Sequence, residues 1–254
     1  MKNEVNYIKQ VNIYKGRLPL WVNMLLKAIF ITFLICCAFV AVFSFIYICT
    51  PVDGPSMQPT INAQCEYVGS KEISGNNTDS VYINRFATPT YGDIIVVNKP
   101  TERGEYVIKR LIAKGGDKVA IEPIGSDYKV LLIKGDSNII EELQEDYLSD
   151  DISLQKCYES FKFYRTGGVN KGELVEGHGD KFEVINYKGN DCYFLKIEED
   201  EIFYLGDNRV NSNDCSTYGA YKKSKCVGRV DIIAKESKNN FSYIFLYFWH
   251  KVFG

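Results

Sequence analysis

The sequence predicts a mainly β protein preceded by one transmembrane helix, and two observations carry this prediction. An uncharged apolar segment occupies residues 28–49. Beyond it, short runs rich in β-branched and aromatic residues alternate with Gly, Asp and Asn, as strands and turns do. The composition, with 46% apolar and 24% charged residues, is ordinary for a folded protein, so a disordered chain is not expected.

The apolar segment is long enough to cross a bilayer as a helix. Its 22 residues would rise about 33 Å, and a hydrocarbon core is about 30 Å thick. A cleavable signal peptide is the alternative, but the apolar part of such a peptide usually has only about 7–15 residues. No clear A-x-A cleavage site follows the segment either. We therefore expect a membrane anchor, with the lipid bilayer as a partner.

The charges that flank this segment predict its orientation. Lys15, Arg17 and Lys27 precede it, whereas acidic residues follow it. By the positive-inside rule, residues 1–27 form a cytoplasmic arm and residues 50–254 lie outside the cytoplasm. The predicted location is the cell membrane, with a single pass.

Six runs beyond the anchor are expected as strands, and no helical periodicity of comparable strength is present outside the membrane segment. The expected strands are Ile94–Val97, Tyr106–Ile112, Val130–Ile133, Tyr193–Ile197, Ile202–Leu205 and Val227–Ile233. Residues 120–200 are interpreted as an inserted subdomain, and residues 50–119 and 201–236 as the core around it.

Two further segments stand out by composition. Residues 141–151 carry six carboxylates, and we expect a solvated helical or loop face there because nothing apolar would gather them into a dry site. Residues 241–254 are densely aromatic, and they suit either the membrane interface or a final strand in the core.

Several classes of function lack support in the sequence. The net charge is −2 and no basic patch is present, so no nucleic-acid partner is expected. Five of the eight cysteines follow the anchor, an odd number without a C-x-x-C motif, so neither a metal nor a cofactor is expected. The only histidines, His178 and His250, lack the neighbours that a Ser-His-Asp site needs.

A serine in a turn-rich stretch is the first candidate for catalysis. Ser56 lies in the sequence Gly-Pro-Ser-Met-Gln-Pro, a few residues beyond the anchor. A rigid loop of this kind would fix a nucleophile and leave backbone N–H groups free to bind an oxyanion. Without further evidence, an ordinary structural turn explains the pattern as well.

A lysine within a predicted strand is the second candidate. Alternation places Lys109 on the same face as Val107 and Leu111, between apolar neighbours. An exposed lysine has a pKa of about 10.4, so only about one in 2,500 is neutral at pH 7. Burial disfavours the ammonium and would make Lys109 a usable base. A lysine on a half-buried strand whose charged end reaches solvent is the common alternative.

The third candidate is the loop of residues 205–219. Asp207, Arg209 and Asp214 can form charge-assisted hydrogen bonds within it. A plain solvated turn is the alternative.

Taken in order, these segments resemble the type I signal peptidases of bacteria. The boxes that match are Ser56-Met57-x-Pro59-Thr60, Gly92–Val97, Lys109-Arg110 with Gly116-Asp117, Gly206-Asp207-Asn208-Arg209-x-x-Ser212-x-Asp214, and Val227–Val230. Residues 120–200 match no pattern of the family. The lysine at position 109 favours the bacterial form, because relatives of the eukaryotic type have histidine at that point.

The resemblance implies an antiparallel β catalytic domain in which Ser56 is the nucleophile and Lys109 the general base. Ser212 would orient the lysine, and the Ser56 N–H would bind the oxyanion. Three residues, Asp207, Arg209 and Asp214, would brace the loop. Three others, Val52, Met57 and Ile108, are expected to contact the substrate.

The implied substrates are the signal peptides of exported preproteins, with small residues at the first and third positions before the cut. The secretion translocon is a further candidate partner. Two alternatives carry less support: a self-cleaving regulator of the same serine–lysine superfamily would have a DNA-binding domain in place of the anchor, and a non-enzymatic relative would not need Ser56, Lys109 and Ser212.

The sequence departs from the family pattern at Ser216, where an arginine usually pairs with an aspartate of the loop. This departure leaves the rigidity of the loop open. At Gly54, where some members carry a hydroxyl, no side chain can donate a hydrogen bond.

Overall fold

The computed structural model of this protein describes residues 19–69, 71–99, 105–148 and 153–237. The chain divides into two compact units, Met1–Phe45 and Ile46–Gly254. The predicted aromatic tail, residues 241–254, and most of the predicted cytoplasmic arm lie outside the described residues.

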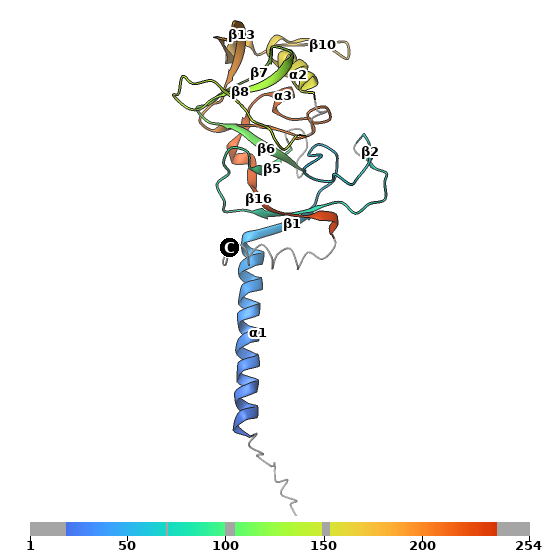
Figure 1. The fold of residues 1–254 in the computed structure, drawn as a ribbon, viewed down its shortest axis with the longest axis vertical. Coiled ribbons are helices and arrows are strands. Elements are labelled where there is room, and N and C mark those ends of the chain that lie inside the picture. The colour runs from blue at the N-terminus through green and yellow to red at the C-terminus, as the bar shows by residue number, and fades with distance from the viewer. Residues whose placement is uncertain (1–18, 70, 100–104, 149–152, 238–254) are drawn as a thin grey trace, which may run out of the picture. The chain divides into compact units, whose positions relative to one another are not determined.

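The first unit contains a single long helix, α1, at Leu20–Ile46 (Figure 1). Its 27 residues rise about 40 Å, and none of its side chains is buried, so it is long and apolar enough to cross a membrane. The helix begins after Pro19, whose carbonyl accepts the first backbone hydrogen bond from Asn23.

The predicted span of residues 28–49 was wrong at both ends. The helix begins earlier because residues 20–26, apart from Asn23, are apolar and four of them are Leu or Met, which favour helix. It ends earlier because Tyr47 begins a strand that pairs with residues 80–84, and backbone N–H groups used in a sheet are not available to a helix.

The second unit is built on a seven-stranded sheet with the order β1-β4-β16-β5-β6-β14-β15, in which every pairing is antiparallel. Its strands are β1 (Tyr47–Pro51), β4 (Ser80–Asn84), β5 (Ile94–Asn98), β6 (Tyr106–Lys114), β14 (Glu201–Leu205), β15 (Tyr221–Lys222) and β16 (Cys226–Ala234). The mainly β, antiparallel fold predicted from the sequence is therefore confirmed.

A second sheet of five strands has the order β12-β13-β7-β8-β9 and is also antiparallel. Its strands are β7 (Lys118–Ile124), β8 (Asp127–Ile133), β9 (Glu141–Glu142), β12 (Phe182–Tyr187) and β13 (Asn190–Lys196). Two short hairpins complete the strands: β2 (Tyr67–Val68) with β3 (Lys71–Glu72), and β10 (Gly168–Asn170) with β11 (Glu173–Val175).

A helix that no strong periodicity indicated, α2, occupies Gln155–Thr166 and packs against β7. Its apolar face is narrow: only Cys157 and Phe161 are buried, and the other positions are mostly polar. Such a helix has a weak periodic signal and is stabilised mainly by tertiary packing. The remaining helical segments are α3 (Cys215–Tyr218) and three single 3₁₀ turns at Gly179–Lys181, Lys223–Lys225 and Lys235–Ser237.

The two sheets share one hydrophobic core. Ile95 and Phe203 of the seven-stranded sheet belong to the same buried cluster as Ile121 and Leu195 of the five-stranded sheet. Phe161 of α2 packs edge-on against Phe203, with ring centroids 5.8 Å apart. The region predicted as an insert thus completes the core on which the strands of the larger sheet rest, and its assignment as a subdomain stays a prediction.

Candidate active site

The hydroxyl of Ser56 and the amine of Lys109 form the centre of the site. Lys109 Nζ lies 2.7 Å from Ser56 Oγ and 3.0 Å from the backbone oxygen of Ile108. Lys109 is only 3% exposed, although its charged form would prefer water. The two residues are 53 positions apart, so the pair exists only because the fold brings them together.

Burial changes the chemistry of this lysine. Desolvation lowers the pKa of Lys109 from 10.5 to about 8, against the opposing effect of Asp214 and Asp207, whose charges raise it. At this pKa about one lysine in ten is neutral at pH 7, compared with about one in 2,500 when exposed. A pKa in this range suits a general base near neutral pH, and the role of Lys109 as that base stays a prediction.

The strand β6 presents Lys109 and its neighbour Arg110 to opposite sides, because side chains alternate along a strand. Lys109 faces Ser56, whereas Arg110 faces the loop that follows β14. Both faces of the strand are buried from Ile108 to Ala113, so burial is not limited to the face that carries Lys109.

The turn that carries Ser56 depends on local backbone geometry. Gly54 adopts a φ of +93°, a value that residues with side chains rarely adopt. The Ser56 N–H donates no hydrogen bond to another described residue, so the part of the turn that the structure describes leaves it available to an oxyanion. Its predicted role in binding the oxyanion stays a prediction.

Asn208 ties the Ser56 turn to the loop that follows β14. The N–H of Asn208 donates to the backbone oxygen of Ser56 at 3.1 Å, and its side-chain amide donates to the backbone oxygen of Pro55 at 3.2 Å. Asn208 was part of a recognised motif but received no role from the sequence, because nothing in the pattern shows where an amide points.

Gly206 lets the same loop approach the nucleophile closely. A Cβ at this position would meet the side chain of Ser212 and lie 2.5 Å from the backbone oxygen of Ser56. Glycine is required here by close contact with the backbone rather than by an unusual φ angle.

Asp207 is fully buried and holds two residues that the sequence did not single out as parts of the site. Arg110 Nε donates to Asp207 at 2.8 Å and Nη2 at 2.6 Å, a bidentate ion pair. Thr60 Oγ1 donates to the same carboxylate at 2.5 Å. Arg110 follows Lys109 in one of the motifs shared with the family, and Thr60 ends the motif that contains Ser56. Their place in these motifs was the signal that could have identified them as parts of the site.

Arg209 forms a charge-assisted hydrogen bond within the loop, but its ion pair is with a carboxylate outside the loop, and its predicted bracing role stays a prediction. Its guanidinium forms a bidentate pair with Glu145, with one Nη1–Oε2 distance of 2.9 Å, and Nε donates to the backbone oxygen of Gly206 at 2.9 Å. The acidic segment was expected to form a solvated helical or loop face, and Glu145 departs from this expectation because its side chain is only 8% exposed. The ion pair with Arg209 compensates the Glu145 carboxylate for its loss of hydration.

Asp214 has partners despite the missing arginine. It accepts hydrogen bonds from the Gly206 N–H at 2.8 Å and from the Ser216 N–H and hydroxyl at 3.1 and 2.8 Å. Asp214 is also the N-cap of α3. Ser216, which stands where the family usually has arginine, thus supplies hydrogen bonds in place of an ion pair.

Ser212 lies beside the dyad without a hydrogen bond to it. Its Oγ is buried and has no hydrogen-bond partner among the described residues. Lys109 is held instead by Ser56 and the Ile108 carbonyl. The predicted role of Ser212 in orienting the lysine stays a prediction.

The dyad opens into a groove of about 480 Å³ between β1 and β6. Most of its lining is apolar, and the three residues predicted to contact substrate, Val52, Met57 and Ile108, all line it. Asp53 and Lys109 are the only charged residues that line it among those the structure describes. A mostly apolar groove that is lined by a candidate nucleophile is suited to binding a short apolar peptide.

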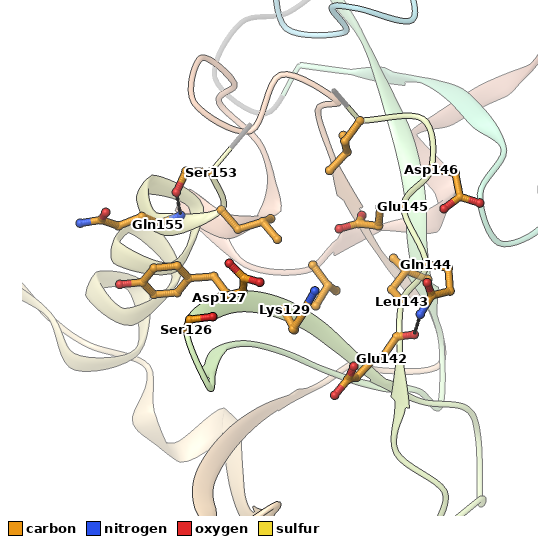
Figure 2. Close-up of a pocket in the computed structure, with 14 residues that line it drawn as sticks. Ser126, Asp127, Lys129, Glu142, Leu143, Gln144, Glu145, Asp146, Ser153 and Gln155 are labelled. Atoms are coloured by element: carbon orange, nitrogen blue, oxygen red, sulfur yellow. Dashed lines mark hydrogen bonds between the residues drawn. The ribbon is translucent and has the colours of Figure 1, made fainter. Parts of the chain in front are cut away.

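A larger pocket of about 890 Å³ lies elsewhere, between β8 and the segments that flank α2 (Figure 2). Its lining is polar and contains no serine, cysteine or threonine beside a buried base. No cluster of His, Cys, Asp and Glu suited to a metal ion occurs among the residues that the structure describes. The Ser56–Lys109 groove is therefore the better candidate for catalysis.

Comparison with known proteins gives consistent matches. The family model described as signal peptidase, peptidase S26, matches residues 24–234. Signal peptidase I of Aquifex aeolicus is 26% identical over 237 residues, which cover 84% of this chain and 85% of that protein. Signal peptidase I of Helicobacter pylori is 26% identical over 157 residues, which cover 55% of this chain. The chain spans about half the length of that relative, 53%.

Among solved structures, a signal peptidase I of Enterococcus faecalis V583 matches with a TM-score of 0.33 and 24% sequence identity. The match covers 56% of this chain and 97% of that one.

We predict that Gly206→Ala destabilises the protein by about 1–3 kcal/mol, the usual cost of forcing extra atoms into a packed site. The added methyl group would push the loop away from the Ser56 backbone. Urea unfolding of the two proteins measures the difference. Asn213→Ala, an exposed position in the same loop, is the control and should change stability by less than about 0.5 kcal/mol. Equal stability of Gly206→Ala and the parent protein would contradict the close contact.

Proposed function

The chain belongs to the signal peptidase family, peptidase S26, and on that premise we propose that it is a membrane-bound serine endopeptidase that removes N-terminal signal peptides from exported preproteins. The observation that carries the proposal is the 2.7 Å contact between Ser56 Oγ and the buried Nζ of Lys109 in the lining of a mostly apolar groove. The α1 helix, long and apolar enough to cross a membrane, agrees with a membrane enzyme.

The proposed reaction is acyl transfer in two stages. Neutral Lys109 accepts the proton of Ser56 as Oγ attacks the carbonyl carbon before the cleavage site. The resulting ammonium then gives its proton to the amine that leaves with the mature protein. A water molecule, activated by the same lysine, attacks the ester on Ser56 and releases the signal peptide. The Ser56 N–H is proposed to stabilise the oxyanion in both stages.

An open edge of β6 supports binding of an extended peptide. Residues 106–109 pair with β5 on one side, whereas pairing with β14 starts only at Arg110. The other edge of residues 106–109 is therefore unpaired within the described residues and faces the groove. We propose that the signal peptide adds a strand along this edge, so that main-chain hydrogen bonds give affinity and the apolar lining selects small side chains.

The location and orientation form a separate part of the proposal. We propose that α1 anchors the protein in the cell membrane, that its N-terminal end lies in the cytoplasm and that the second unit lies outside. Three basic residues support this orientation: Lys15 and Arg17 precede α1, and Lys27 lies near its N-terminal end. A contact with the secretion translocon would place the enzyme beside emerging substrates and stays a prediction.

We predict that Ser56→Ala and Lys109→Ala each abolish cleavage of a model preprotein, because one removes the nucleophile and the other the base. Ser212→Ala should cost about tenfold in kcat, the effect of losing roughly one hydrogen bond. Single-turnover cleavage, with unfolding curves as a check on folding, measures these effects. Near-normal turnover of Lys109→Ala would exclude the lysine as base.

We predict that kcat/KM rises with pH through an apparent pKa of about 8, because protonation of Lys109 below this pH removes the base. The activity optimum should therefore be alkaline. Initial rates at low substrate concentration between pH 6 and about pH 10 measure the profile. The control is the double variant His178→Gln/His250→Gln, which should keep the ascending limb. Loss of that limb in the control would transfer the base role to a histidine.

We predict that a protease added outside intact protoplasts digests the second unit but not the N-terminal arm. The reason is the excess of basic residues before the apolar helix, which favours retention of that end in the cytoplasm. Epitope tags at the two ends, detected with and without detergent, measure accessibility. Protection of the second unit with an exposed N-terminal tag would invert the orientation.

A further inference from the structure

We propose that Glu145 and Tyr147 are positioning residues for the serine–lysine dyad. Together they form a clamp that holds Arg110 and Arg209, the two arginines behind the dyad, in fixed places. The inference rests on the proposed function, because it assigns a role in the same reaction to residues 143–148, the segment that follows β9.

The first half of the clamp is the ion pair between Glu145 and Arg209. The Arg209 side chain is 0% exposed and the Glu145 side chain 8% exposed. The bidentate geometry uses both terminal nitrogens of the guanidinium. Although burial by itself would lower the pKa of Arg209, the carboxylate of Glu145 outweighs this effect and raises it. Removing the carboxylate would leave a buried, unpaired cation, which a protein accommodates by moving the charge towards water.

The second half of the clamp is the ring of Tyr147. The guanidinium carbon of Arg110 lies 3.8 Å from the centre of that ring, a close cation–π contact. The Tyr147 hydroxyl donates to Glu145 at 2.6 Å and accepts from Arg209 at 3.2 Å. One tyrosine thus contacts both arginines, one through its face and the other through its hydroxyl.

The clamp reaches the dyad by two short routes. Arg110 adjoins Lys109 in β6, and its ion pair with Asp207 connects that strand to the loop after β14. Arg209 donates to the backbone oxygen of Gly206, in the same loop. That loop returns to the nucleophile through the Asn208 N–H, which donates to the backbone oxygen of Ser56. A shift of either arginine would therefore change the distance between Ser56 and Lys109.

Backbone pairing alone does not place this segment. The strand β9 comprises only Glu141 and Glu142, and one further backbone bond joins the Leu143 N–H to Val130. Figure 2 shows Glu145 on the wall of the larger pocket, so one side of the segment borders open space. The contacts with Arg110 and Arg209 are therefore what hold Glu145 and Tyr147 in place.

Two variants remove the clamp in separate ways, and two others are controls. Glu145→Gln removes the charge that pairs with Arg209, and Tyr147→Leu removes the ring over Arg110. Tyr147→Phe keeps the ring and should recover much of the activity lost in Tyr147→Leu. Glu142→Gln removes a carboxylate three residues away whose ion pair is with Lys188, outside the site, and it should behave as the parent protein.

The expected result is a loss in kcat of between about tenfold and a hundredfold for Glu145→Gln and Tyr147→Leu, with KM changed by less than about twofold, because a misplaced dyad slows chemistry more than binding. Rates are measured well below the lowest unfolding midpoint of the set. A matched loss in the Glu142→Gln control, or unchanged kcat in both clamp variants, would overturn the proposal.

The pH dependence of kcat/KM distinguishes a loss of dyad positioning from a general loss of stability. The groups that face Lys109 are the Ser56 hydroxyl, the carboxylates Asp207 and Asp214 and the thiol of Cys215, with Asp53 in the same groove. Since desolvation is the main cause of the lowered lysine pKa, a loosened loop that admits water should move the ascending limb upwards, towards 10.5. A variant that is merely less stable would keep the limb in place.

A readout without turnover tests the clamp even where the proposed function fails. Hydrogen exchange of the backbone amides of residues 206–211 should be faster in Glu145→Gln than in Glu142→Gln, since Gly206 and Asn208 donate the bonds that hold the loop. Equal exchange in the two variants would refute the clamp. An active site that cleaves no preprotein, with faster exchange in Glu145→Gln, would refute the proposed function and leave the clamp standing.

Discussion

The site depends on one lysine that can lose its proton near neutral pH although the charges of two carboxylates, Asp207 and Asp214, act on it. Burial lowers the pKa of Lys109, whereas the charges of Asp214 and Asp207 act in the opposite direction. A lysine that formed an ion pair with either aspartate would remain protonated and could not act as a base. The structure avoids this outcome by giving each carboxylate other partners. Arg110 and Thr60 occupy Asp207, and backbone N–H groups with the Ser216 hydroxyl occupy Asp214.

This arrangement separates charge by strand geometry. Consecutive residues of β6 point to opposite sides, so the cation that must lose its proton and the cation that must keep it are neighbours in sequence but not in environment. Lys109 meets a hydroxyl and a carbonyl, neither of which demands a positive charge. Arg110 meets a carboxylate and an aromatic face, both of which favour one. The strand β6 thus carries the proposed base on one side and, on the other side, the arginine that pairs with Asp207.

Local patterns predicted the groups that stand in motifs but not the contacts that join distant segments. Ser56 and Lys109 could be paired because two boxes of a known family contain them. The link from Arg209 to Glu145 spans 64 positions and joins a motif to a segment without one, so no local signal reports it. The helix α2 was missed for a related reason, since two buried side chains in twelve residues leave little periodicity. The strand β1 was read as the end of the apolar helix, because Tyr47 and Cys49 suit both states until a pairing partner is known.

The shared core has a consequence for how sequences of this kind can diverge. Phe203 lies just before the loop that follows β14, yet its ring packs against Phe161 and belongs to one buried cluster with residues of the five-stranded sheet. Residues 118–196 therefore cannot be exchanged between distant relatives as a free module, since a transplanted sheet would have to match the shape of an interior formed jointly with its host. Substitutions on the two sides of that interior should accumulate in compensating pairs, and recombination within the domain should be tolerated mainly at its exposed hairpins, such as β10–β11.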